Sequence, residues 1–95
     1  MSGHPADYPV ERLMVEPHST KENVHGALFI STEGVSIYDG VMLRIGVLGE
    51  GSMAHTLRVG ATAEYSSKRH GRFEVRVLTI DPYNARAHLL VAKLN

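Results

Sequence analysis

The sequence predicts a small all-β protein: an antiparallel meander of six to seven short strands that forms a barrel or a two-sheet sandwich. Three observations predict this class. Apolar and polar residues alternate with the period of a β-strand along several runs. Turn residues recur at intervals of about 8–12 residues, and no stretch repeats its apolar residues with the period of a helix.

The last third of the chain, GRFEVRVLTIDPYNARAHLLVAKL, predicts a β-hairpin. In its turn, Asp81 can accept hydrogen bonds from backbone amides, Pro82 presets φ for the second turn position, and Asn84 tolerates left-handed geometry. The alternation gives the first strand an apolar face and a charged face. The apolar face carries Phe73, Val75 and Val77, and the charged face carries Arg72, Glu74 and Arg76.

The N-terminal part predicts a tail followed by an edge strand. Residues 1–9 are polar and interrupted by proline, so we expect a flexible tail ahead of a single β domain that spans residues 10–95. Residues 10–16 lie between two prolines, which favours an edge strand. Residues 17–23 are polar and predict a loop, in which Ser19 to Glu22 have the spacing of a helix-capping box.

Further strands are predicted in the middle of the chain. Residues 24–30 are mostly apolar, and the next four, 31–34, predict a tight turn. Residues 35–38 and 41–48 flank Asp39-Gly40, a pair typical of a type I′ hairpin turn. Residues 53–65 alternate throughout, and Gly60 marks a bulge, a bend or a short turn that divides them.

Composition limits the class of protein. The chain has no cysteine, which excludes disulfides, thiolate nucleophiles and cysteine-containing zinc sites. We see no signal segment and no apolar run long enough to span a membrane, so we expect a soluble, cytoplasmic protein. The net charge is zero, yet residues 1–50 carry seven acids and three bases and residues 51–95 the reverse. Either the halves neutralise each other in the fold, or the basic half offers a surface to an anionic ligand or to a second subunit.

The polar positions of the last four predicted strands carry the candidate ligand-binding residues. If these strands are neighbours, their side chains share one face of one sheet. Arginine suits this role because its planar guanidinium can bind carboxylates and phosphates with two hydrogen bonds. Alternatively, the face is simply solvated, and Glu64 and Glu74 pair with arginines across strands. The candidates are Arg44, Arg58, Arg72, Arg76, Arg86 and His88.

His55 is the one candidate for catalysis. It shares the parity of Met53 and Leu57, where a histidine is more often a core or interface residue than a base. It could act as a general base if it faced a cavity with Asp39 or Glu50 nearby. The six histidines have no metal-ligand spacing, so we predict neither a metal nor a cofactor.

We therefore predict a non-catalytic binding module that engages a protein partner or a small anionic ligand through the arginine-bearing face. Tyr38 or Tyr65 would add amphipathic contacts. The alternative is a small β-barrel enzyme whose pocket contains His55. A nucleic-acid-binding domain ranks third, because the predicted face lacks the aromatic residues on which bases stack. We also expect a homo-oligomer, with a dimer favoured, because small β domains pair through exposed edges.

Overall fold

The computed structural model describes residues 10–94 and contains eight β-strands and no helix within that range. The strands are β1 (Val10–Val15), β2 (Ser19–Val24), β3 (Leu28–Ser36), β4 (Gly40–Val47), β5 (Gly51–Leu57), β6 (Thr62–Ser67), β7 (Gly71–Asp81) and β8 (Arg86–Lys93). The all-β prediction is confirmed. The predicted tail at residues 1–9 lies outside the described range.

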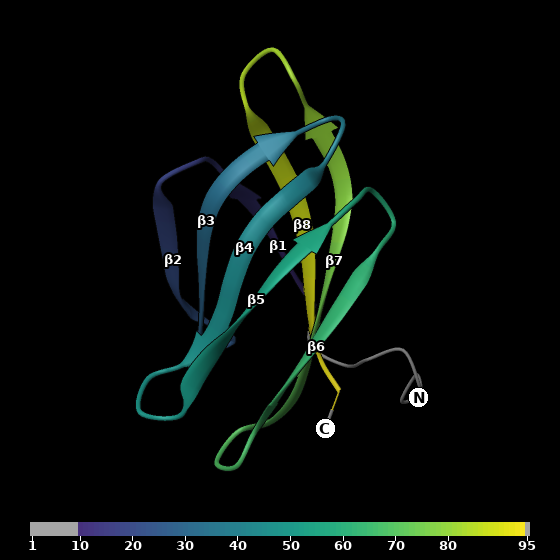
Figure 1. The fold of residues 1–95 in the computed structure, drawn as a ribbon. Helices are drawn as coiled ribbons and strands as arrows, with labels where there is room; N and C mark the ends of the chain where they lie inside the picture. Colours follow the sequence, from purple (N-terminus) through teal and green to yellow (C-terminus); the bar gives the residue numbers. More distant parts are fainter. Residues whose placement is uncertain (1–9, 95) are drawn as a thin grey trace, which may run out of the picture.

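The strands form two four-stranded antiparallel sheets, with the orders β1-β8-β7-β6 and β2-β3-β4-β5. Figure 1 shows the two sheets packed face to face, with hairpin turns at both ends of the molecule. Followed around the molecule, the strands keep their sequence order, and β8 pairs with β1. The circle is interrupted at two seams, between β1 and β2 and between β5 and β6, where no ladder forms. The fold is therefore a meander flattened into a sandwich rather than a closed barrel.

The core lies between the sheets and takes its side chains from both. Phe73, Val75 and Val77 of β7 are fully or almost fully buried, as the alternation predicts. From the opposite sheet, Ile30 and Ile45 point into the same layer and are also fully buried. The outward face of β7 is left to polar and charged residues.

The turn between β7 and β8 has the predicted anchor but a different left-handed residue. Asp81 accepts hydrogen bonds from the amides of Tyr83 and Asn84, at 3.0 and 3.3 Å, and from the Asn84 side chain at 2.7 Å. These bonds lower the pKa of Asp81, the Asn84 side chain contributing most. The positive φ, 52°, belongs to Ala85 and not to Asn84.

The turn at Asp39-Gly40 is a hairpin but not a type I′ turn. Ser36 pairs with Gly40, so the loop has three residues, and of Asp39 and Gly40 only Gly40 has a positive φ, 101°. A type I′ turn requires positive φ at both central positions. The Ser36 hydroxyl accepts hydrogen bonds from the backbone amides of Tyr38 and Asp39. These bonds stabilise the longer loop.

Three predicted boundaries were wrong, but they leave the number of strands unchanged, and the eighth strand arises because the turn at Gly60 divides β5 from β6. Residues 31–34 are not a turn: β3 runs through them, with a register shift between Thr32 and Gly34 that marks a bulge. The predicted strand 24–30 is instead broken by a turn in which His25 and Gly26 have positive φ. Residues 19–24 form an edge strand, because their backbone pairs with β3 whatever the polarity of their side chains.

Candidate functional site

The six candidate ligand-binding residues do not share one surface. Arg72 and Arg76 lie on β7, and Arg86 and His88 on β8, all on the outer face of the β1-β8-β7-β6 sheet. Arg44 points outward from β4, on the opposite side of the sandwich. Arg58 lies in the turn between β5 and β6. The condition that the last four predicted strands be neighbours fails at the β5–β6 seam, which separates Arg44 and Arg58 from the rest.

The structure adds Arg12 to the face that carries Arg76. Arg12 and Arg76 are both register partners of Leu90, so the three residues form one row across β1, β8 and β7. Both arginines are exposed, and Leu90 is half-buried between them. We call this set (Arg12, Leu90 and Arg76) the arginine row. The Cα atoms of Arg12 and Arg76 are separated by two strand spacings, or about 10 Å.

The guanidinium groups of the arginine row have no partner within residues 10–94. Neither Arg12 nor Arg76 forms an ion pair or a side-chain hydrogen bond there. His88, two residues from Leu90 on β8, is exposed on the same face. On the side of the arginine row away from His88, the neighbouring row contains Glu64 and Glu74, which lie directly opposite each other on β6 and β7. The charge of the face is thus divided into a cationic row and an acidic row.

Arg72 and Arg86 already interact with acidic residues. Arg72 lies 3.7 Å from a carboxylate oxygen of Glu64, and both side chains are about half exposed, so the pair contributes little stability. Arg86 is the register partner of Asp81, and its charge is the smallest of the contributions that lower the pKa of that carboxyl. For these two arginines the charge-balance alternative describes the structure better than an open binding face does.

Arg58 lies beside a separate pocket. This pocket has a volume of about 270 Å³ and is lined by Ile37, Gly40, Arg58, Val59 and Ile80. The lining residues come from the β3–β4 and β5–β6 turns, from the start of β4 and from β7. Ile37 and Val59 are more than half exposed. The Arg58 side chain has no hydrogen bond or ion pair in the described part of the chain. We call this the loop-end pocket.

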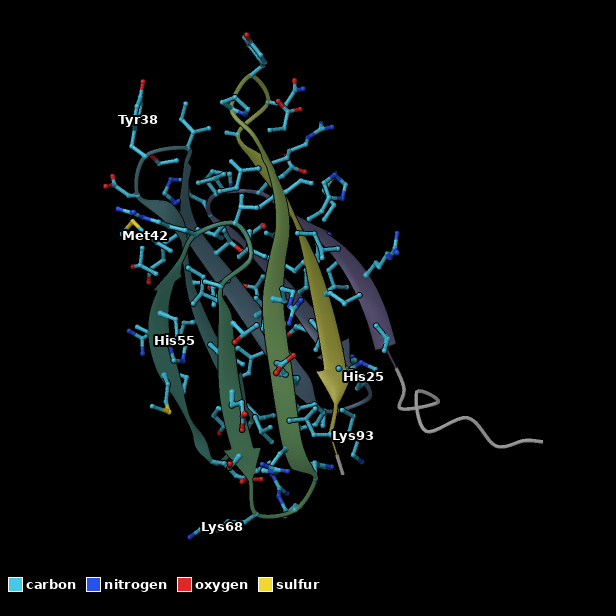
Figure 2. The ribbon with its side chains drawn as sticks, turned by 90° about the vertical axis from the view of Figure 1, so that its right-hand side faces the viewer. His25, Tyr38, Met42, His55, Lys68 and Lys93 are labelled. Atoms are coloured by element: carbon cyan, nitrogen blue, oxygen red, sulfur yellow. The ribbon has the colours of Figure 1, made fainter. Side chains whose placement is uncertain are left out.

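His55 lines a smaller hollow of about 160 Å³ together with Glu33, Met42, Leu43, Ala54 and Thr56. Figure 2 shows His55 and Met42 beside β5 at one margin of the molecule. The two carboxylates named as partners, Asp39 and Glu50, do not line this hollow, and no hydrogen bond joins His55 to Glu33. Among the described residues, the buried Nε2 of His55 has no hydrogen-bond partner. Nothing in this geometry orients a general base.

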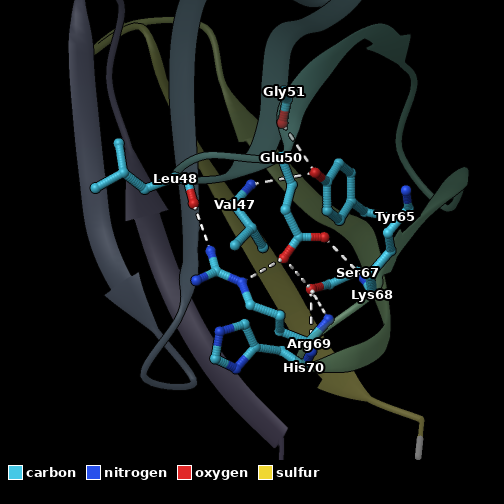
Figure 3. Close-up of polar contacts among 9 residues, drawn as sticks. All are labelled: Val47, Leu48, Glu50, Gly51, Tyr65, Ser67, Lys68, Arg69 and His70. Atoms are coloured by element: carbon cyan, nitrogen blue, oxygen red, sulfur yellow. Dashed lines mark hydrogen bonds and ion pairs between the residues drawn. The ribbon is translucent and has the colours of Figure 1, made fainter.

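Glu50 is instead part of a structural cluster at the end of the sandwich opposite Tyr38 (Figures 2 and 3). Its carboxylate accepts hydrogen bonds from the Lys68 amide at 2.7 Å, the Ser67 hydroxyl at 2.8 Å and Arg69 Nε at 3.1 Å. These contacts, led by the Lys68 amide, lower the pKa of Glu50 from 4.5 to about 2. Arg69 also donates to the Leu48 carbonyl at 2.7 Å. The cluster joins the β4–β5 turn to the β6–β7 turn. Within it, the Glu50 carboxylate and the Arg69 guanidinium both have hydrogen-bond partners.

A second polar contact joins the sheets through the β2–β3 turn. His25 Nε2 lies 2.8 Å from the Val91 carbonyl, and the His25 amide donates to Glu11 at 3.3 Å.

Among the described residues there is no group of three or more histidine, aspartate or glutamate side chains that could hold a metal ion. Within the same range no helix is long and apolar enough to cross a membrane.

Sequence reasoning missed Arg12 because the signal is not local. Arg12 stands among polar and apolar residues near the N-terminus, and only the pairing of β1 with β8 brings it beside Arg76. Comparisons with protein-family models, curated proteins and solved structures found no match.

Proposed function

We propose that this protein is a binding module and that the arginine row binds an acidic segment of a protein partner. One observation carries the proposal: Arg12 and Arg76 flank Leu90 on an exposed face, and neither guanidinium has a carboxylate partner in the described residues. Each guanidinium can donate two parallel hydrogen bonds to a carboxylate. Leu90 supplies an apolar contact between them.

The spacing favours a protein segment over a single small anion. Arginines about 10 Å apart at the backbone are too far apart to bind one carboxylate without bending toward each other. An extended chain presents alternate side chains on one face at about 7 Å, which the long arginine side chains can span. The described sheet residues around the row include no phenylalanine, tyrosine or tryptophan on which a base could stack, and His88 offers only one ring. We place this activity in the cytoplasm, where a cysteine-free chain fits.

The experiment measures binding of hexaglutamate by the double variant Arg12→Gln/Arg76→Gln. Exposed ion pairs contribute up to about 1 kcal/mol each, so losing two should weaken binding roughly 10-fold. The matched control is Lys21→Gln/Arg44→Gln, which removes two positive charges from the opposite sheet and should bind like the wild type. Unchanged affinity in the double variant would refute the proposal. Binding of a thymidine oligonucleotide but not of hexaglutamate would favour the nucleic-acid alternative.

The loop-end pocket supports a second candidate, binding of a small amphipathic anion. Its volume of about 270 Å³ is slightly below the usual range for ligand sites, so the ligand would be small. Ile37, Val59 and Ile80 would cover an apolar body, and Arg58 would pair with its acidic group. A titration with phenylacetate should shift the NMR signals of the Gly40 and Val59 amides, and Arg58→Gln should abolish the shifts. Identical shifts in that variant would exclude the role of Arg58.

A further inference from the structure

The four edge strands of the sandwich differ in how they are protected. Edge strands expose unpaired backbone groups, and proteins usually protect them with charged side chains, bulges or covering segments. β1 carries Glu11 and Arg12, and β6 carries Glu64. β2 carries Lys21 and Glu22 and has a register shift. β5, GSMAHTL, contains no charged residue and no proline, and its register with β4 has no shift.

β5 is also poorly covered by the opposite sheet. Met53 is the register partner of the fully buried Ile45 and so has core parity, yet it is 54% exposed. By contrast, the core-facing residues of β6, such as Ala63 and Tyr65, are buried. In Figure 2, β5 forms one margin of the molecule, with His55 and Met42 beside it. Both faces of this strand are therefore accessible around Met53, and its edge away from β4 pairs with no other strand in the described part of the chain.

We propose that β5 pairs antiparallel with β5 of a second copy of this chain, which joins two sandwiches through one continuous eight-stranded sheet. A twofold axis at Ala54 would place Met53 opposite His55 of the second copy, and Ser52 opposite Thr56. Sulfur against an aromatic ring and hydroxyl against hydroxyl are both favourable cross-strand pairs. A second copy fits better than an unrelated strand because the sequence of β5 is complementary to itself about this axis.

Charge explains why the other edges are less suited to such a pair. In antiparallel self-pairing, a charged residue on the twofold axis lies opposite its own copy, so charge limits the registers that are open to β1, β2 and β6. β5 carries no charged residue and has no such limit. The hollow lined by Met42, Ala54 and Thr56 lies along the same strand and offers space for side chains of the second copy. This surface is separate from the arginine row, so the two proposals fail independently.

Two variants test the dimer. The wild type should show a mass that rises toward that of a dimer in sedimentation equilibrium between about 10 μM and 1 mM. Ala54→Lys puts two like charges on the twofold axis and should remain monomeric over this range. Leu48→Lys, at a residue that is 83% exposed in the β4–β5 turn, is the control and should dimerise like the wild type. A wild type that is monomeric throughout would overturn the proposal, as would an Ala54→Lys variant that is folded by circular dichroism and still dimerises.

Cross-linking gives a second test that does not depend on the folding of the lysine variant. Residues directly opposite in an antiparallel pair have Cα atoms about 4.5–5.5 Å apart, which suits a disulfide. Because the chain has no cysteine, Ala54→Cys can only link to its copy. With copper–phenanthroline as oxidant, it should form a covalent dimer at least 10-fold faster than Leu48→Cys. Equal rates for the two variants would contradict the proposed interface.

Discussion

At the scale of single residues, Gly40 shows a position that only glycine can occupy. Its φ is 101°, and an added Cβ would lie 2.3 Å from the Leu57 carbonyl oxygen. This contact cannot relax by a side-chain rotation, because the obstacle is backbone. The preference for glycine here comes from the close approach of β4 to the end of β5 as well as from the turn itself.

We expect Gly40→Ala to lower the free energy of unfolding by about 2–4 kcal/mol, measured by urea denaturation. Gly26→Ala is the control, since Gly26 also has a positive φ but nothing lies within 4 Å of the added Cβ. It should cost about 1 kcal/mol, the strain of the left-handed conformation alone. Equal losses in the two variants would show that the contact with Leu57 is unimportant.

Glu50 predicts a pH dependence of stability. Its pKa is about 2 in the folded protein, below the ordinary value of 4.5. A group whose pKa is lowered by folding stabilises the fold fully above its unfolded pKa, and this contribution disappears as the pH falls through the folded value. The contribution of Glu50 should therefore be complete above about pH 5 and lost near pH 2.

The measurement compares melting temperatures of the wild type and Glu50→Gln from pH 7 to pH 2. The variant should be less stable at pH 7, and the difference should shrink as the pH falls toward 2. Glu22→Gln is the control, because the Glu22 carboxylate accepts no hydrogen bond from the described residues, and it should leave the melting temperature unchanged. A difference between wild type and Glu50→Gln that stays constant with pH would contradict the role assigned to this carboxylate.

At the scale of elements, the β5–β6 seam is held by side chains where no ladder forms. The Tyr65 hydroxyl donates to the Gly51 carbonyl at 2.8 Å and accepts from the Val47 amide at 3.3 Å. Tyr65 is 5% exposed, so these bonds are largely shielded from water. Together with the Glu50 cluster they fix one end of the seam, while the chain itself closes the other end through the β5–β6 turn.

Tyr65→Phe should lower the free energy of unfolding by about 1–2 kcal/mol, since it removes two largely buried hydrogen bonds to the backbone. Hydrogen exchange should also become faster at the amides of Val47 and β5. Tyr83→Phe removes the same hydroxyl from a residue that is 95% exposed, and should change neither quantity. If Tyr65→Phe is as stable as Tyr83→Phe, the seam does not depend on this hydroxyl.

At the scale of the whole molecule, each sheet covers the apolar face of the other. Ile45 belongs to one sheet and Leu89 to the other, and both are fully buried in the shared core. Neither sheet can expose this face to water without losing the hydrophobic contribution that stabilises it. We therefore expect the two sheets to unfold together.

Ile45→Ala and Leu89→Ala should each lower the free energy of unfolding by about 2–5 kcal/mol while preserving a single transition. Far-ultraviolet circular dichroism and tyrosine fluorescence should give the same urea midpoint in each variant. Curves that separate in either variant would mean that one sheet unfolds without the other.

The sequence by itself determined the class of fold and the face to which most strand residues point. Alternation with a period of two follows from strand geometry alone, so the buried side of β7 and the turn at Asp81 could be predicted without knowing any neighbour. The bulge in β3 and the polar edge strand β2 could not, because both depend on which strand lies alongside.

Only the tertiary structure decided which charged residues meet. Backbone hydrogen bonds are alike for nearly all residue types, so a strand does not specify its partner locally, and the partner is set by the arrangement that covers every apolar face. That arrangement pairs the two ends of the chain, β1 and β8, and brings Arg12 beside Arg76. It also separates Arg44 and Arg58 from them and leaves β5 as an uncharged edge.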